Sequence, residues 1–249
     1  MHYVMSDLHG RYDLFLQMLD KISFSENDTL YLLGDLIDRG PDGIKLLQDV
    51  MNRPNVIPFL GNHEDMFYRV VRKIGKYCTE DEHSELMETM FIWTQCNGGN
   101  VTWKDYCAQP AEQRAAILSY LEDFTVYDEV RVGENTFLLA HAGVGAWEPE
   151  KDLNGCTLHD FLWEETDYDR IYYKGKYLIT GHTPTGLIDP ACSGRIIRKN
   201  NHIAIDCGAF FTGTLGCLCL DTMEEFYVCS GIEVFPAAGV PADTNEQEE

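Results

Sequence analysis

Five short stretches of this 249-residue chain carry residue types that bind metal ions. Each directly follows an apolar run, and together they hold four of the eight histidines. Carboxylate, imidazole and amide ligands suit manganese, iron or zinc, and the two oxygens of one carboxylate can bridge two such ions. The five stretches are Asp7-x-His9, Asp35-x-x-Asp38-Arg39, Asn62-His63-Glu64, His141-Ala142-Gly143 and Gly181-His182-Thr183. They predict one shared metal site.

The apolar runs before these stretches predict strands that position the candidate ligands. Residues 30–33 are typical of a buried strand, and Asp35 follows where that strand ends. The carboxyl ends of neighbouring strands converge on one crevice, so side chains that are distant in sequence can meet there. Asp7 and His9 are two residues apart, so in an extended segment they point the same way and can share a cation. Asp and Gly after a single strand can also indicate only a turn.

Three strand–loop–helix units are expected at the start of the chain. Strands are predicted over 2–6, 30–33 and 56–60, with helices indicated by apolar residues at 14, 15, 18, 19 and 22 and, after Pro41, at 44, 47 and 51. Right-handed crossovers and a largely parallel sheet follow. Later strands are predicted over 136–140, 177–180, 202–206, 215–220 and 225–229, the last three as an antiparallel meander. The expected class is α/β or α+β, with two mixed sheets and outer helices.

Residues 65–123 are expected to be a helical insertion within a single domain of residues 1–240. Apolar spacing predicts three helices there, and the turn over 97–100 is either a helix stop or part of a substrate wall. The last residues, 241–249, are acidic and polar and are predicted to be disordered. The nine cysteines include no Cys-x-x-Cys pair and are expected to be reduced and mostly buried, with Cys217 and Cys219 on one strand face.

Composition limits the partners. The net charge of −22 would repel a nucleic-acid backbone, and an acidic protein that handles phosphate needs a bound cation to reverse the local charge. No stretch approaches the roughly 20 apolar residues that cross a membrane, and no basic segment precedes an apolar one at the start. We expect a cytoplasmic protein that binds neither nucleic acid nor membrane. The oligomeric state stays open.

The ordered set of motifs resembles the metallophosphoesterases, specifically the phosphoprotein phosphatase family with its bacterial serine/threonine phosphatases and diadenosine tetraphosphatases. The resemblance rests on Asp7-x-His9 preceded by Ser6 where the family has Gly, and on Gly34-Asp35-x-x-Asp38-Arg39-Gly40, Gly61-Asn62-His63-Glu64, His141-Ala142-Gly143, Gly181-His182-Thr183-Pro184 and Asp206-x-Gly208-Ala209. It covers residues 4 to about 220. It implies a calcineurin-like fold, in which two mixed β-sheets form a sandwich flanked by helices.

The resemblance also implies roles for individual residues. One metal would be bound by Asp7, His9 and Asp35, and the other by Asp35, Asn62, His141 and His182. The cations, manganese first with iron or zinc as alternatives, would acidify a bridging water whose hydroxide attacks phosphorus in line. His63 would protonate the leaving oxygen, Asp38 would orient its imidazole, and Arg39 and Asn62 would contact the phosphate. A simple Asp38–Arg39 salt bridge is the alternative for that pair.

Two departures from the family pattern bear on the substrate. Many protein phosphatases of the family have Arg before Gly-Asn-His-Glu, where this chain has Leu60. A second phosphate-binding Arg is expected after the Trp-containing segment that follows His141, and Arg170 is the candidate. We expect a serine/threonine-type protein phosphatase acting on a phosphoprotein or a small phosphate ester. A hydrolase of diadenosine tetraphosphate or another nucleotide pyrophosphate is the alternative.

Two rival interpretations come from other classes. Cys192 and Arg198 have the Cys-x5-Arg spacing of cysteine-dependent phosphatases, but that chemistry needs a loop leading into a helix, and the sequence here predicts a hairpin. A metal-binding scaffold without activity is the other rival. It would not need His63, Asp38 and Arg39, which act in chemistry rather than in metal binding.

Overall fold

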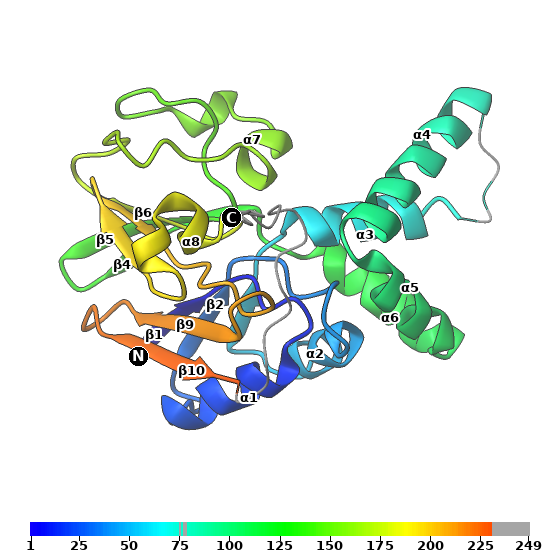
Figure 1. Ribbon diagram of the computed structural model, residues 1–249, viewed down its shortest axis with the longest axis horizontal. Helices are drawn as coiled ribbons and strands as arrows, with labels where there is room; N and C mark the ends of the chain where they lie inside the picture. The colour runs from blue at the N-terminus through cyan, green and yellow to red at the C-terminus, as the bar shows by residue number, and fades with distance from the viewer. Residues whose placement is uncertain (75, 77–78, 231–249) are drawn as a thin grey trace, which may run out of the picture.

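A computed structural model of the protein describes residues 1–74, 76 and 79–230. Two mixed five-stranded sheets pack face to face, with helices outside them and a group of helices at one end (Figure 1). The predicted fold class is confirmed. The predicted tail, 241–249, lies outside the described residues, and the single domain over 1–240 stays a prediction.

The first sheet has the strand order β10-β9-β1-β2-β3. Its three parallel strands come from the start of the chain, and Tyr3 of β1 pairs with Leu30 of β2, which pairs with Val56 of β3. The antiparallel strands β9 and β10 come from the end of the chain. The bounds are β1 His2–Met5, β2 Thr29–Leu32, β3 Val56–Pro58, β9 Thr214–Cys219 and β10 Glu225–Cys229.

The second sheet has the order β4-β5-β6-β8-β7 and lies against the first. Strands β5, β6 and β8 are parallel, and β4 and β7 are antiparallel edge strands. Asn200 and Asn201, both with positive φ, form the tight turn between β7 and β8. The bounds are β4 Tyr127–Val132, β5 Asn135–Ala140, β6 Tyr177–Thr180, β7 Ile197–Lys199 and β8 His202–Ala204.

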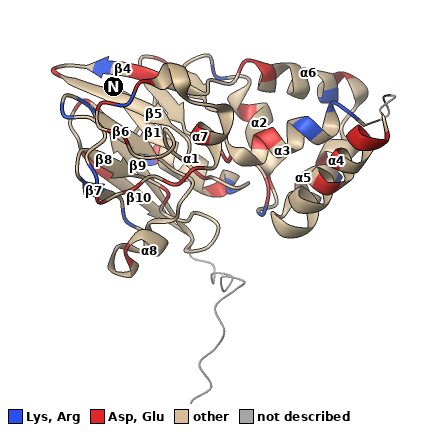
Figure 2. Ribbon diagram, turned by 90° about the horizontal axis from the view of Figure 1, so that it is seen from above, with Lys and Arg blue, Asp and Glu red and all other residues tan. Residues whose placement is uncertain are grey.

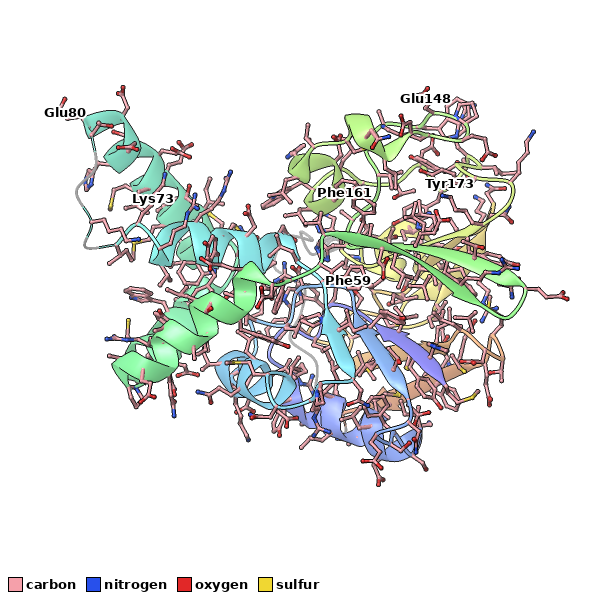
Figure 3. All side chains as sticks on the ribbon, turned by 180° about the vertical axis from the view of Figure 1, so that it is seen from behind. Phe59, Lys73, Glu80, Glu148, Phe161 and Tyr173 are labelled. Carbon is pink, nitrogen blue, oxygen red and sulfur yellow. The ribbon has the colours of Figure 1, made fainter. Side chains whose placement is uncertain are left out.

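The core lies on both faces of the first sheet, because successive side chains of a strand point in opposite directions. Val4 faces the second sheet, where it packs with Phe59 and with Phe137 of β5, whereas Tyr3 and Met5 face the helices. Phe59 is labelled between the two sheets in Figure 3. Strands buried on both faces need apolar residues at nearly every position, which is why these segments appear as continuous apolar runs.

Helices cover the outer faces of the sheets. Helix α1 (Tyr12–Lys21) and helix α2 (Gly43–Val50) pack on the outer face of the first sheet (Figure 1). Helix α7 (Leu158–Leu162) and the loops around it cover the second sheet, where Phe161 is buried. The remaining short helices are η2 (Leu153–Gly155), α8 (Thr185–Ile188) and η3 (Pro190–Cys192).

Between β3 and β4 the described chain is helical. It contains α3 (Asn62–Val71), α4 (Glu80–Phe91), a π-helical segment η1 (Ile92–Cys96), α5 (Gly99–Ala108) and α6 (Ala111–Glu122). Helix α4 projects from the body of the molecule, with Glu80 at its outer end (Figure 3). Three helices were predicted in this segment. Helix α5 was missed because it starts at a glycine pair and its buried residues are few.

The structure corrects two further predictions and contains one strand that was not predicted. Strand β8 is not part of a meander with β9 and β10. The chain turns at Gly208 and Gly213, both with positive φ, and crosses to the other sheet. The edge strand β4 was not predicted, because most of its side chains are exposed and polar. Of eight described cysteines, all free, only three are buried: Cys207, Cys217 and Cys219.

The acidic residues are spread over the helices and loops rather than confined to one element (Figure 2). Within the described residues, no helix combines the length and the apolar character needed to cross a membrane.

Candidate metal centre

The loops after β1, β2, β3, β5 and β6 converge, and the backbone of the loops after β1, β2 and β6 is strained. The candidate residues Asp7, His9, Asp35, Asp38, Arg39 and His182 all have φ between +42° and +69°. Side chains other than glycine rarely adopt this region, and such strain persists where the surrounding structure imposes it, often at functional sites. Glycine is required at two close approaches, because a Cβ on Gly61 would overlap Oδ1 of Asp35 and one on Gly181 would overlap Oδ2 of Asp7.

Asp35 lies at the centre of the cluster. Its Oδ2 is 3.6 Å from Nε2 of His9 and 3.7 Å from Nε2 of His63. Its Oδ1 is 3.5 Å from Nε2 of His141. The carboxylate therefore presents one oxygen to each of two groups, His9–Asp35–His63 and Asp35–His141–His182. Within each group the candidate ligand atoms lie within 4.8 Å of one another.

Asp7 and Asn62 complete the predicted set. Oδ1 of Asp7 lies 4.0 Å from Nε2 of His9 and has no hydrogen-bond partner although it is buried. The amide oxygen of Asn62 is placed 2.9 Å from Nε2 of His141 and 3.2 Å from Nδ1 of His182. The same atom position is 3.2 Å from both oxygens of Asp35. If the NH₂ group of Asn62 occupies this position, it donates hydrogen bonds to the two imidazole nitrogens and to Asp35. If the oxygen occupies it, the oxygen is a candidate cation ligand together with these atoms.

Hydrogen bonds fix the tautomers of two histidines. Nδ1 of His9 lies 3.0 Å from the carbonyl oxygen of Ile37, and Nδ1 of His141 lies 2.7 Å from that of Leu33. A carbonyl can only accept, so Nδ1 is the protonated nitrogen in both rings. Their Nε2 lone pairs therefore face Asp35, as in metal sites where an outer hydrogen bond orients a ligating imidazole.

Burial governs the electrostatics of the cluster. It raises the pKa of Asp35 well above the ordinary range, and the charges of Asp7 and Glu64 raise it further, although His63 opposes them. Burial lowers the pKa of His9 and lowers that of His182 to about 3, so these rings are neutral at pH 7. Neutral imidazole is the form that binds metal, and clustered carboxylates are stabilised by a cation. The residues present therefore fit divalent metal ions.

His63 and Arg39 lie beside this cluster. Nδ1 of His63 is 2.7 Å from Oδ2 of Asp38, with both side chains fully buried. The guanidinium of Arg39 reaches Nε2 of His9 at 2.6 Å and Nε2 of His63 at 3.1 Å. Among the described residues no salt bridge joins Asp38 to Arg39, so that alternative is wrong. Asp38 instead contacts Nδ1 of His63, and Arg39 contacts Nε2, the edge at which a phosphate ester would bind.

Two residues that support the site were not predicted to do so. The Glu64 carboxylate is fully buried and accepts the backbone N–H groups of Asp35 and Leu36 at 2.8 Å, Ile37 at 3.2 Å and Gly61 at 3.1 Å. Ser6 donates its hydroxyl to Oδ2 of Asp7, which also accepts the N–H of His182 at 2.9 Å. Both residues lie within motifs, but spacing alone does not reveal such contacts.

Other sequence candidates lie elsewhere. Arg170 is exposed, stacks on Trp147 and lies 3.6 Å from Asp167, so the structure does not bring it into the cluster. Leu60 packs against the apolar cores in the place where an Arg would precede Gly61.

The Cys-x5-Arg rival lacks its required geometry. Cys192 ends a short 3₁₀ helix and a hairpin follows, while Arg198 is engaged with Glu225. Desolvation and the neighbouring Asp189 raise the pKa of the Cys192 thiol, which is the wrong direction for a nucleophile.

The sandwich and the convergent acidic and histidine loops define a metallophosphoesterase. Residues 3–205 match the family model described as calcineurin-like phosphoesterase, and the chain belongs to that family.

Two kinds of curated relative are similar to this chain. The symmetrical bis(5'-nucleosyl)-tetraphosphatase of Wigglesworthia glossinidia brevipalpis is 40% identical over 88 residues, which are 34% of this chain and 32% of that protein. The match thus spans about a third of that relative, as it does in the first relatives generally. Serine/threonine-protein phosphatase 1 of Salmonella typhimurium is 28% identical over 224 residues, covering 86% of this chain and 88% of that protein.

Solved structures share the fold. One provisionally named as a diadenosine tetraphosphatase has a TM-score of 0.62 at 16% identity and covers 92% of both chains. A serine/threonine phosphatase from Saccharomyces cerevisiae has a TM-score of 0.53 at 14% identity and covers 97% of this chain and 81% of its own. At these identities the likeness concerns the fold alone.

Proposed function

We propose that this chain is a dinuclear metal hydrolase whose two cations share Asp35. The observation that supports this most directly is the placement of the two Asp35 oxygens, one facing His9 and the other facing His141. Asp7 would complete the first metal site. Asn62 and His182 would complete the second. Manganese is the proposed ion in both sites, with iron or zinc as alternatives that the same donor set accepts.

The chain's own residues would then divide the chemistry. When bound, the cations neutralise phosphoryl oxygens and lower the pKa of water. Arg39 would hold the phosphate oxygens, because its planar guanidinium already lies between the Nε2 atoms of His9 and His63. His63 would give a proton from Nε2 to the leaving oxygen, and Asp38 would keep its ring in place through Nδ1.

For the substrate we propose a dinucleoside polyphosphate, cleaved symmetrically. The sequence alone favoured a protein phosphatase, but the first curated relatives are named as symmetrical tetraphosphatases and are 37–40% identical in their matching segments. Leu60 supports the same choice, since it places a partly buried aliphatic side chain where many protein phosphatases of the family have an arginine. Symmetrical cleavage of diadenosine tetraphosphate would yield ADP alone.

A phosphoprotein is the second candidate substrate. A specific observation favours it: the relative named as a serine/threonine phosphatase aligns over 86% of this chain, whereas the tetraphosphatase match covers 34%. Exposed acidic residues on α4 would suit a substrate peptide with basic residues. The proposed location for either activity is the cytoplasm.

One assay separates these proposals. The manganese-loaded protein is given p-nitrophenyl phosphate, diadenosine tetraphosphate and a phosphoserine peptide, and kcat/KM is measured for each. We expect diadenosine tetraphosphate to have the highest value, with ADP as sole product. A higher value for the phosphopeptide would reverse the order of the two substrates. No hydrolysis with manganese, iron or zinc would contradict the proposed function itself.

A further inference from the structure

Trp93 connects the helical segment between β3 and β4 to the Asp38–His63 pair. Its side chain is fully buried, and its indole N–H donates to Oδ2 of Asp38 at 2.7 Å. It lies in η1, a π-helical stretch that follows α4 without a break. Such stretches are uncommon in proteins and often occur at functional sites. The unusual local geometry therefore coincides with a contact to a proposed catalytic group.

The indole shares its acceptor with the imidazole. Oδ2 of Asp38 accepts from Nε1 of Trp93 and from Nδ1 of His63, both at 2.7 Å. Asp38 is also held through its backbone, because its N–H donates to Oγ1 of Thr102 in α5 at 2.9 Å. Two fixed donors on one oxygen, together with the fixed backbone, restrict the rotation of this buried carboxylate. The direction of the His63 ring is thus set by residues outside its own loop.

The turn before α5 is shaped around these contacts. A Cβ on Gly99 would overlap the indole of Trp93, so only glycine fits there. Gly98 has φ +76°, and its carbonyl oxygen accepts the N–H of Arg39 at 3.2 Å. The turn is therefore more than a helix stop, since it contacts both Trp93 and the proposed phosphate-binding arginine.

We propose that Trp93 and Thr102 are positioning residues, which hold Asp38 so that Nε2 of His63 points at the leaving oxygen. This inference rests on the proposed function, in which His63 is the acid. The reaction moves one proton from Nε2 of His63 to the leaving oxygen as the P–O bond breaks, and Trp93 and Thr102 keep all their own protons. Packing is the competing explanation, because Trp93 also contacts the rings of Phe67 and Trp103.

The test compares Trp93→Phe with Trp103→Phe in the manganese-loaded protein. The first removes the N–H to Asp38, while the second makes the same chemical change in a neighbouring ring. Activity is measured on phenyl phosphate, a poor leaving group that needs an acid, and on 2,4-dinitrophenyl phosphate, which does not. We expect Trp93→Phe to lower kcat on phenyl phosphate about tenfold, the loss of one hydrogen bond to a charged group. The KM for phenyl phosphate and the kcat on 2,4-dinitrophenyl phosphate should change less than about twofold. Trp103→Phe should have wild-type values on both esters.

A double-mutant cycle separates positioning from packing. Added to His63→Asn, Trp93→Phe should cause no further loss, since it acts only through His63. The proposal would be overturned if Trp93→Phe lowered kcat equally on both esters. It would also be overturned if Trp93→Phe lowered kcat by the same factor in the wild-type and His63→Asn backgrounds.

If Trp93→Phe fails to fold by circular dichroism, Thr102→Val gives the same readout, with Thr102→Ser expected to restore the rate on phenyl phosphate. The proposal would also be overturned if Thr102→Val left the ratio of the kcat values on the two esters unchanged. If the wild-type protein hydrolyses neither ester, kcat of the same variants is compared on diadenosine tetraphosphate and on a phosphoserine peptide. No hydrolysis of these substrates either would remove the proposed function, and this inference with it.

Discussion

The buried carboxylate of Glu64, in the first turn of α3, accepts the backbone N–H of Asp35 at 2.8 Å. Three more backbone N–H groups, those of Leu36, Ile37 and Gly61, donate to the same carboxylate. The loop that presents Asp35 is therefore held from the side by a residue of the next loop–helix unit. Burial raises the pKa of Glu64, while the bound N–H groups favour its charged form.

Glu64→Ala should destabilise the fold strongly. The substitution leaves four N–H groups without an acceptor inside the protein, and we expect the free energy of unfolding to fall by about 3–5 kcal/mol. Urea denaturation of the two proteins measures the difference. Glu85→Ala is the matched control, because its exposed carboxylate pairs with Lys73 on the surface, and it should change stability by less than about 0.5 kcal/mol. If Glu64→Ala had the same midpoint of urea denaturation as wild type, the loop that carries Asp35 would be stable without the Glu64 carboxylate.

Asp35→Asn should lower metal content and turnover together. The substitution removes the negative charge that both groups of candidate ligands face, so both cations lose a ligand of the right charge. We expect at least about a 100-fold loss of activity, together with a lower manganese content by elemental analysis after gel filtration. Asp20→Asn, at an exposed position of α1, serves as the control. If Asp35→Asn kept the full manganese content, the proposal that the two cations share the Asp35 carboxylate would be contradicted.

His63→Asn should spare the metals and slow the reaction. Distances alone group His63 with His9 and Asp35, so a ligand role has to be distinguished from an acid role. As an acid, His63 should be needed for phosphoserine and much less for an activated aryl phosphate, and manganese content should match wild type. Loss of one metal ion per chain would identify His63 as a ligand, and full turnover on phosphoserine would remove it from both roles.

The strand ends that carry the site could be predicted, because strands buried on both faces give continuous apolar runs and the motif residues follow them directly. The supporting contacts could not. Trp93 looks like an ordinary apolar position of a helix, and nothing in the spacing shows that its N–H reaches Asp38 across 55 residues. Glu64 belongs to a quoted motif, yet its role lies in backbone contacts to a loop 29 residues earlier.

The sequence also did not predict which strands the short strands pair with. Residues 202–206 were correctly predicted as a strand, but periodicity indicates which face is buried and not which sheet receives the strand. The direction of the chain after β8 depends on the positive φ of Gly208 and Gly213. Edge strand β4 has Asp128, Glu129 and Arg131 among its six residues, so its apolar alternation is limited to Val130 and Val132 and is too short to detect.

Alkylation of Cys192 should leave activity intact. Desolvation and the neighbouring Asp189 raise the pKa of the thiol, and among the described residues no contact joins it to the candidate metal ligands. Iodoacetamide should therefore modify this partly exposed cysteine and the exposed ones with less than about a twofold change in kcat, if catalysis does not pass through a thiolate. Cys192→Ser should behave as wild type in the same assay. Inactivation that the Ser variant escapes would revive the cysteine mechanism.

His202 should make the fold less stable in acid. The ring is buried, stacks on Tyr168 at 4.6 Å and has Nε2 2.7 Å from Oγ1 of Thr180. Burial lowers its pKa to about 3, whereas in the unfolded chain it is about 6.5. Between these values only the unfolded chain takes up the proton. Stability is therefore complete above about pH 6.5 and falls by up to about 1.4 kcal/mol for each pH unit below it.

His202→Phe keeps an aromatic ring against Tyr168 and removes the titrating group. Measured by urea denaturation between pH 6 and pH 4.5, in EDTA so that metal release does not contribute, its stability should fall less steeply than that of wild type by about 1 kcal/mol per pH unit. Part of the slope remains, because burial also lowers the pKa of His182. His159→Phe, at an exposed position of α7, should keep the wild-type slope. Parallel slopes for His202→Phe and wild type would mean that His202 is protonated in the folded protein, against the burial that its position in β8 imposes.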